Sequence, residues 1–301
     1  MPSAKTILTR VVFGGIMIAA IACLLAVEYY EPWPAIADMQ GLLLALVIVV
    51  LCVMALRELN RIASAAGSGL LAVSATVGTL LIATQPIWYK FAPVDFVLWD
   101  NLRPLSFISM MTPADVWCMI GLIVAGAFLE QMIRHRLDAA VTRVAATVLA
   151  VAYLGVGAAI ILAIRLDKGV PALILFLAAV KCTDIGAYFT GSAIGRHKLI
   201  AWLSPGKSWE GLFGGLAAAA GVSMLVVWLF GMRMSLGWAA GFGVIVGAVG
   251  QFADLCESLL KRSARIKDSG ALVPEFGGVL DVLDSPLLAA PAAWVLLNFL
   301  L

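Results

Sequence analysis

Long apolar runs alternate with short polar segments along almost the whole chain. Each run approaches or reaches the roughly 17–25 residues that a helix needs to cross the hydrocarbon core of a bilayer. Lipid offers no hydrogen-bond partners to a bare backbone, so these runs are expected to be helical. The pattern predicts an all-α, polytopic membrane helical bundle of about nine transmembrane helices. The expected spans are 7–29, 40–57, 69–90, 113–133, 140–164, 170–191, 209–231, 235–261 and 282–301.

Basic residues are unevenly distributed between the connections of these spans. Most of the 20 lysines and arginines fall in alternate connections, which include 192–208 and 262–281. Because cytoplasmic loops carry the excess of Lys and Arg, this bias predicts a cytoplasmic N-terminus and an external C-terminus. Both polar loops, 192–208 and 262–281, are then expected on the cytoplasmic side.

Composition agrees with a membrane protein and excludes one class of partner. The chain is 63% hydrophobic and 13% charged, whereas soluble domains have roughly 25% charged residues. A net charge of +2 is too small to favour a nucleic-acid partner.

The span 170–191 contains two ionisable residues, Lys181 and Asp184. They are three positions apart and therefore share a helix face. Ionisable groups inside a membrane are costly, so they are either paired or functional by default. A structural ion pair lining the bundle and a polar cavity that holds phosphate or metal are both compatible with this pattern.

The end of span 235–261 has one strongly polar face. Asp254, Glu257, Ser258 and Lys261 follow one another at spacings that place them on one side of a helix. Such a face cannot contact lipid and must face a cavity or water. Gly247 and Gly250 are expected on the same side, where another helix or a ligand could approach closely.

Two further aspartates stand at the start of the last span. Asp281 and Asp284 are again three positions apart and follow the pair Gly277 and Gly278, which permits a sharp turn. With Asp254 they supply three carboxylates, which suit a hard cation such as Mg²⁺. Capping of the helix start is the plain alternative for Asp281, but it would not account for both aspartates.

The segment 204–211 precedes the span 209–231 and contains Lys207 and Ser208. It lacks the first glycine of a P-loop, and no strand is expected before it, so we reject a Walker motif. Backbone N–H groups at a helix start, a lysine and a serine can still cradle a phosphate. Plain capping, with Ser204 as the N-cap and Pro205 in the first turn, explains the same residues.

Residues 175–301 resemble the phosphatidate cytidylyltransferase family, also called CDP-diacylglycerol synthases. Three ordered motifs carry the resemblance. The first consists of Asp184, Ala187, Tyr188 and Gly191; the second of Ser204, Pro205, Lys207, Ser208, Glu210 and Gly211; and the third of Ser258, Lys261, Arg262, Lys267, Asp268, Pro274, Gly277, Gly278, Asp281, Asp284 and Ser285. The first half of the chain matches only as generic membrane helices.

Three positions depart from the family pattern: Glu275, Phe276 and Val282. The family usually has glycine, histidine and arginine there. Loss of the arginine at 282 removes a fixed guanidinium that could bind phosphate or carboxylate. We expect a neighbouring basic residue, Arg265 or Lys267, to supply the missing charge, and we favour an active enzyme.

The resemblance implies a reaction, a place and a set of residues. CTP and phosphatidate would give CDP-diacylglycerol and pyrophosphate, in phospholipid biosynthesis at the inner (cytoplasmic) membrane, with the site facing the cytoplasm. Residues 1–170 would form N-terminal transmembrane helices and 171–301 the catalytic region, and a homodimer is compatible with this reading. The roles implied are catalysis by Asp254, Lys261, Asp281 and Asp284; binding of Mg²⁺, with a second cation such as K⁺, by Asp254, Asp281 and Asp284; and substrate binding by Lys181, Asp184, Lys207, Ser208, Ser258, Arg262, Lys267 and Asp268.

A phosphate monoester is already an adequate nucleophile, so catalysis should consist of positioning and electrostatic stabilisation. Two enzymes remain as alternatives: a related CTP-dependent lipid-phosphate cytidylyltransferase and a polyprenol kinase. An ion-coupled transporter that uses Lys181, Asp184 and Asp254 is an alternative of another class. It would more often show repeated halves with broken helices, and the sequence has no such repeat.

Overall fold

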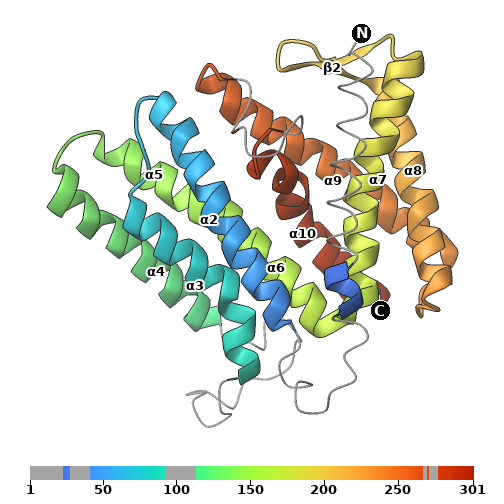
Figure 1. The fold of residues 1–301 in the computed structure, drawn as a ribbon, viewed down its shortest axis with the longest axis horizontal. Coiled ribbons are helices and arrows are strands. Elements are labelled where there is room, and N and C mark those ends of the chain that lie inside the picture. The colour runs from blue at the N-terminus through green and yellow to red at the C-terminus, as the bar shows by residue number, and fades with distance from the viewer. Residues whose placement is uncertain (1–22, 28–40, 92–112, 267–269, 271–276) are drawn as a thin grey trace.

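The computed structural model describes residues 23–27, 41–91, 113–266, 270 and 277–301. The described part is almost entirely helical, which confirms the all-α prediction apart from one short hairpin. The helices are α2 (Leu42–Ala65), α3 (Ala72–Phe91), α4 (Pro113–Glu130), α5 (Ala140–Ala150), α6 (Gly157–Ala163), α7 (Gly169–Ile194), α8 (Trp209–Leu229), α9 (Leu236–Ser263) and α10 (Leu280–Leu300). Figure 1 shows them as one inclined bundle.

Six helices of the described part are long and apolar enough to cross a membrane, so this is a multi-pass membrane protein. The predicted span 69–90 corresponds to a shorter apolar helix, Ala72–Trp88. The predicted span 7–29 lies mostly outside the described residues. The count of about nine spans therefore stays a prediction.

The predicted spans 140–164 and 170–191 belong to one helical run, Ala140–Ile194, of 55 residues. A straight helix of that length would be about 80 Å long, far more than a bilayer core of about 30 Å. The run includes three stretches of α-helix joined by the π-helical segments Val151–Val156 and Ile164–Lys168. The chain turns at Gly169, whose φ of 82° is accessible mainly to glycine. Figure 1 shows α6 and α7 meeting at this bend.

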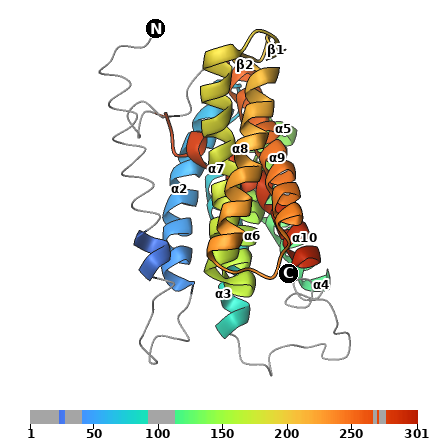
Figure 2. The same cartoon turned by 90° about the vertical axis from the view of Figure 1, so that its right-hand side faces the viewer.

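Helices α7, α8 and α9 lie side by side, as Figure 2 shows. A small residue on α9 permits this close approach. A Cβ atom at Gly247 would overlap Thr183 Oγ1 of α7, as the sequence suggested for this glycine. Gly250 is also buried against α7, but less tightly: a Cβ atom there would lie at an ordinary 3.5 Å from its nearest neighbour, Val180.

A two-stranded antiparallel hairpin connects α7 to α8. It pairs β1 (Lys198–Ile200) with β2 (Ser204–Ser208), with Lys198 opposite Ser208 and Ile200 opposite Ser204. Helix α8 therefore starts at Trp209, and Ser208 is its N-cap, with Oγ accepting from Gly211 N at 3.1 Å. The expectation that Ser204 caps this helix is wrong, because Ser204 and Pro205 belong to the strand.

One buried apolar cluster extends through helices of both halves, including α2, α6, α7 and α10. The predicted regions 1–170 and 171–301 thus share a core. The hairpin that follows α7 lies at the same end of the bundle as the C-terminal end of α9, while the C-terminus lies at the other end (Figure 1).

Candidate metal and phosphate site

Helices α7, α9 and α10 surround a polar pocket of about 220 Å³. Its lining is ionisable except for one serine. The lining residues are Asp184 of α7; Asp254, Glu257 and Lys261 of α9; and Asp281, Asp284 and Ser285 of α10. The structure thus brings together four predicted site residues of α9 and α10 with Asp184, as expected for charges that cannot face lipid.

Three carboxylates meet at the base of this pocket. Asp254, Glu257 and Asp284 each offer one oxygen, and these oxygens lie within 4.8 Å of one another. Glu257 and Asp284 are only 1% and 3% exposed. Buried like charges at this distance repel one another strongly unless a cation or protons compensate them.

A hard cation fits this cluster. Glu257 Oε1 is buried and has no hydrogen-bond partner among the described residues. A buried carboxylate oxygen is normally satisfied, and Glu257 belongs to the three-carboxylate cluster, so this carboxylate suits a metal. Mg²⁺ prefers such oxygen ligands and shares its coordination with substrate phosphates.

Asp281 lines the same pocket but is engaged differently. Its Oδ1 lies 2.7 Å from Lys261 Nζ, and its Oδ2 accepts from Gly278 N at 2.6 Å. Asp281 is not the N-cap of α10, the alternative considered for it: the N-cap is Val279, and the N–H of Gly278 precedes the helix. Lys261 also reaches Glu257, at 2.6 Å, so one ammonium bridges Asp281 to the three-carboxylate cluster. Asp281 as a metal ligand stays a prediction, whereas Glu257 is a cluster member to which the sequence had assigned no role.

Gly277 makes the contact of Asp281 possible. Its φ of 91° lies in the left-handed region, and a Cβ atom there would overlap Asp281 Oδ2. The sharp turn predicted from the two glycines is therefore confirmed at Gly277.

Two more lysines reach the acidic residues from other elements. Lys207 of β2 lies 2.7 Å from Asp254 Oδ2 and donates to the Gln251 carbonyl at 3.2 Å. Lys181 lies 3.9 Å from Asp184, and Gln251 Nε2 donates to Asp184 at 2.8 Å. Lys181, Lys207 and Lys261 thus place three ammonium groups around the carboxylates, where phosphate oxygens would find cationic partners.

Other predicted residues lie elsewhere. Ser258 is half-buried and Arg262 is exposed, and neither is among the described residues that line the pocket. The hydroxyl of Ser208 is used to cap α8. Lys267 and Asp268 lie outside the described residues, as do Glu275 and Phe276. Substrate contacts of all these side chains stay predictions.

The position of Val282 has a cation beside it. Lys181 Nζ donates to the Val282 carbonyl at 2.8 Å. Arg265, which the sequence suggested as a source of charge, is exposed and is not among the described residues that line the pocket. Lys181 therefore places an ammonium group against the backbone of Val282, one of the three departures from the family pattern.

Sequence reasoning gave no site role to three residues around the pocket. It placed Glu257 on the polar face of span 235–261 without a role, and helical spacing could also have found Gln251, three positions before Asp254. Glu58 of α2 accepts hydrogen bonds from Val279 N and Leu280 N at the start of α10. No local pattern could have indicated this contact, because the partners are 221 and 222 positions away.

Comparison with known proteins gives the same assignment as the motifs. The model of the cytidylyltransferase family matches residues 8–300, nearly the whole chain. The chain belongs to the cytidylyltransferase family.

Two relatives illustrate the similarity within this cytidylyltransferase family. The phosphatidate cytidylyltransferase of Staphylococcus aureus strain COL is 36% identical over 153 residues, which cover 51% of this chain and 57% of the relative. That of Brucella suis biovar 1 strain 1330 is 40% identical over 141 residues, covering 46% and 52%. The chain thus aligns with little more than half the length of these relatives.

Proposed function

We propose that this protein transfers a cytidylyl group from CTP to phosphatidate, giving CDP-diacylglycerol and pyrophosphate. One observation carries the proposal: Asp254, Glu257 and Asp284 cluster in a pocket that Lys207 and Lys261 also reach. Membership of the cytidylyltransferase family and the printed names of the relatives support the choice of CTP and phosphatidate.

The carboxylates of α9 and α10 would hold the metal. Asp254, Glu257 and Asp284 would bind Mg²⁺, and Asp281 remains a proposed further ligand in the same pocket. A second cation such as K⁺ would find oxygen ligands among the carboxylates that remain. When bound, Mg²⁺ offsets negative charge on the CTP phosphates and on the leaving pyrophosphate.

The reaction needs little covalent help from the protein. A phosphate oxygen of phosphatidate forms a bond to the α-phosphorus of CTP, and the bond from that phosphorus to the β-phosphate bridging oxygen breaks. Pyrophosphate leaves with the electron pair. Because no proton has to be removed from the attacking dianion, the work left to the protein is to bring two anions together and to stabilise charge.

The lysines suit this task. Lys207 and Lys261 would bind phosphates of CTP, and both already lie against carboxylates of the cluster. Lys181 and Asp184 are partly exposed, with 41% and 35% of their side chains accessible, and would line the route of the lipid head group. Ser258 and Arg262 of α9, with Lys267 and Asp268 beyond it in the sequence, complete the proposed substrate contacts.

We also place the protein in the inner membrane, with the pocket facing the cytoplasm where CTP is available, and allow for a homodimer. The basic residues of the hairpin and of the α9 terminus support this orientation.

Purified protein in mixed micelles with CTP, phosphatidate and Mg²⁺ tests the activity. Equal amounts of CDP-diacylglycerol and pyrophosphate are expected, with neither product from Asp284→Asn. A polyprenol and other lipid phosphates are supplied in parallel reactions. Formation of CDP with a phosphorylated polyprenol would instead identify a kinase, and a preference for another lipid phosphate would identify a related cytidylyltransferase.

A further inference from the structure

Glu58 connects the N-terminal half of the chain to the helix that carries Asp281 and Asp284. It lies on α2 and is only 5% exposed. Its Oε1 accepts from Val279 N at 2.9 Å and its Oε2 from Leu280 N at 2.8 Å. Both carboxylate oxygens are thus bonded to the first turn of α10.

This contact satisfies donors that the helix itself cannot satisfy. The first N–H groups of a helix have no partner within it, and leaving one unsatisfied in a buried place is costly. Here Gly278 N donates to Asp281, and the next two N–H groups donate to Glu58. An anion is also favourable at the positive end of the helix dipole. Two carboxylates, one local and one from α2, therefore hold the start of α10.

The orientation of this turn decides where the pocket carboxylates point. Asp281 directly follows Leu280, and Asp284 lies less than one turn further along the same helix. A tilt or a change in the backbone of the first turn would move both side chains relative to Asp254 and Glu257 of α9. Backbone packing also encloses Glu58, since a Cβ atom at Gly270 would lie 2.6 Å from its Oε1.

We infer that Glu58 is a positioning residue for the acidic pocket: by bonding the first turn of α10, it sets Asp281 and Asp284 at the places where they bind a divalent cation. This inference rests on the proposed function only in that the pocket takes such a cation.

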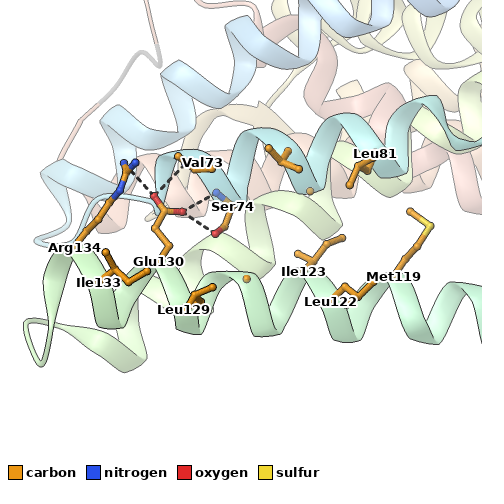
Figure 3. A pocket seen from close by; sticks show the side chains of 13 residues that line it. Val73, Ser74, Leu81, Met119, Leu122, Ile123, Leu129, Glu130, Ile133 and Arg134 are labelled. Atoms are coloured by element: carbon orange, nitrogen blue, oxygen red, sulfur yellow. Dashed lines mark hydrogen bonds and ion pairs between the residues drawn. The ribbon is translucent and has the colours of Figure 1, made fainter.

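The chain contains a matched control for this role. Glu130 of α4 caps the start of α3 in the same way: it accepts from Val73 N at 3.2 Å and from Ser74 N at 2.7 Å. Figure 3 shows this carboxylate at the polar end of an apolar groove between α3 and α4, with Arg134 beside it. None of the described residues that line the acidic pocket belongs to this groove. Glu130 is therefore a buried interhelical cap without a link to the carboxylate cluster.

The experiment compares Glu58→Gln with Glu130→Gln. Each change keeps the shape of the side chain, removes its charge and sets an amide donor against a backbone N–H. Binding of Mn²⁺, a probe for the divalent site, is measured by electron paramagnetic resonance on the full-length protein without nucleotide. Mutation of a residue that orients metal ligands typically lowers metal affinity about 10–100-fold, so Glu58→Gln should weaken Mn²⁺ binding at least tenfold. Glu130→Gln should leave it within about twofold of wild type, although both variants lower the unfolding temperature.

A second variant removes one of the two backbone donors from the other side. Val279 has a φ of −64°, which already suits proline, and Val279→Pro deletes the N–H that donates to Glu58 Oε1 but keeps that of Leu280. It should also weaken Mn²⁺ binding, and the double variant should bind no worse than Glu58→Gln alone. If Glu58→Gln does not fold, Val279→Pro decides the question. The inference would be overturned if folded Glu58→Gln, or Val279→Pro, bound Mn²⁺ as tightly as wild type. It would also be overturned if Glu58→Gln and Glu130→Gln lost Mn²⁺ affinity equally.

Turnover separates this inference from the proposed function. Weakened Mn²⁺ binding in Glu58→Gln supports the positioning role whether or not wild type is active. If wild type forms no CDP-diacylglycerol, only the proposed function is contradicted. Where wild type is active, Glu58→Gln should raise the Mg²⁺ concentration for half-maximal rate more than it lowers kcat. If Glu58→Gln is active and reaches half-maximal rate at the same Mg²⁺ concentration as wild type, only the positioning role is contradicted.

Discussion

At the scale of single residues, helical spacing alone does not distinguish the four carboxylates of the acidic pocket, but their contacts do. Asp254, Glu257, Asp281 and Asp284 all occupy faces that turn to the pocket. Only Asp281 is bonded both to a lysine and to a backbone N–H, whereas Glu257 keeps an oxygen without a hydrogen-bond partner among the described residues. The oxygen with no partner is the one best placed to accept a cation.

The first prediction compares Glu257→Gln with Asp281→Asn. Loss of a charged contact where phosphate charge develops costs about 3 kcal/mol, so Glu257→Gln should lower turnover about 100-fold. It should also weaken Mn²⁺ binding more than Asp281→Asn does. Turnover at several Mg²⁺ concentrations and Mn²⁺ titration measure both effects. If Asp281→Asn loses more Mn²⁺ affinity than Glu257→Gln, Asp281 rather than Glu257 is the principal metal ligand of the two.

The second prediction concerns Lys207, which competes with a cation for Asp254. Lys207→Met removes an ammonium 2.7 Å from that carboxylate. A partly exposed ion pair is worth about 1 kcal/mol, so Mn²⁺ should bind several-fold more tightly without it. The KM for CTP should rise at the same time, because a phosphate partner is lost. If Mn²⁺ binding weakens together with CTP binding, Lys207 does not oppose the metal in this way.

At the scale of elements, α9 combines a packing face and a chemical face. Its earlier turns carry Gly247, which lies against Thr183 of α7, and its later turns carry Asp254, Glu257 and Lys261. Close packing of α9 on α7 brings its acidic residues beside Asp184, and α10 completes the pocket with Asp281, Asp284 and Ser285.

The third prediction compares two glycines of α9. At Gly247 an alanine Cβ would overlap Thr183 Oγ1, whereas at Gly250 it would lie 3.5 Å from Val180. Overpacking costs about 1–3 kcal/mol, so Gly247→Ala should lower the unfolding temperature in detergent. Gly250→Ala should leave it unchanged or raise it, since alanine favours a helix by up to about 1 kcal/mol over glycine. The same unfolding temperature in both variants would argue against close contact between α7 and α9.

At the scale of the whole molecule, the polar hairpin and the end of α9 share one end of the bundle. The C-terminus lies at the other end. Whichever side of the membrane holds the hairpin is therefore also the side nearer to Lys207 and to Asp254, with which Lys207 pairs. Orientation thus decides whether the pocket meets cytoplasmic CTP.

The fourth prediction tests this orientation by labelling cysteines in intact cells. Cys23 and Cys118, which are exposed, are first replaced by serine. Lys198→Cys and Arg265→Cys lie at the hairpin end, and Arg233→Cys lies between α8 and α9 at the opposite end. A membrane-impermeant thiol reagent should label only Arg233→Cys until the membrane is permeabilised, because basic loops face the cytoplasm. Labelling of the first two from outside would place the pocket on the wrong side for CTP.

The sequence by itself determined the features that depend on local periodicity and on the cost of charge in lipid. Apolar runs predicted most of the helices, and the spacing of Asp254, Glu257, Lys261, Asp281 and Asp284 predicted one polar pocket, because charged faces must turn away from lipid. The packing of the helices decided which of these charges meet: α10 against α9 sets Asp281 beside Lys261 and brings Asp284 to Asp254 and Glu257. The turn at Gly169 and the hairpin strand at Ser204 are formed by neighbouring residues. The cap from Glu58, in contrast, joins segments more than 200 positions apart, and no local pattern of residues encodes such a contact.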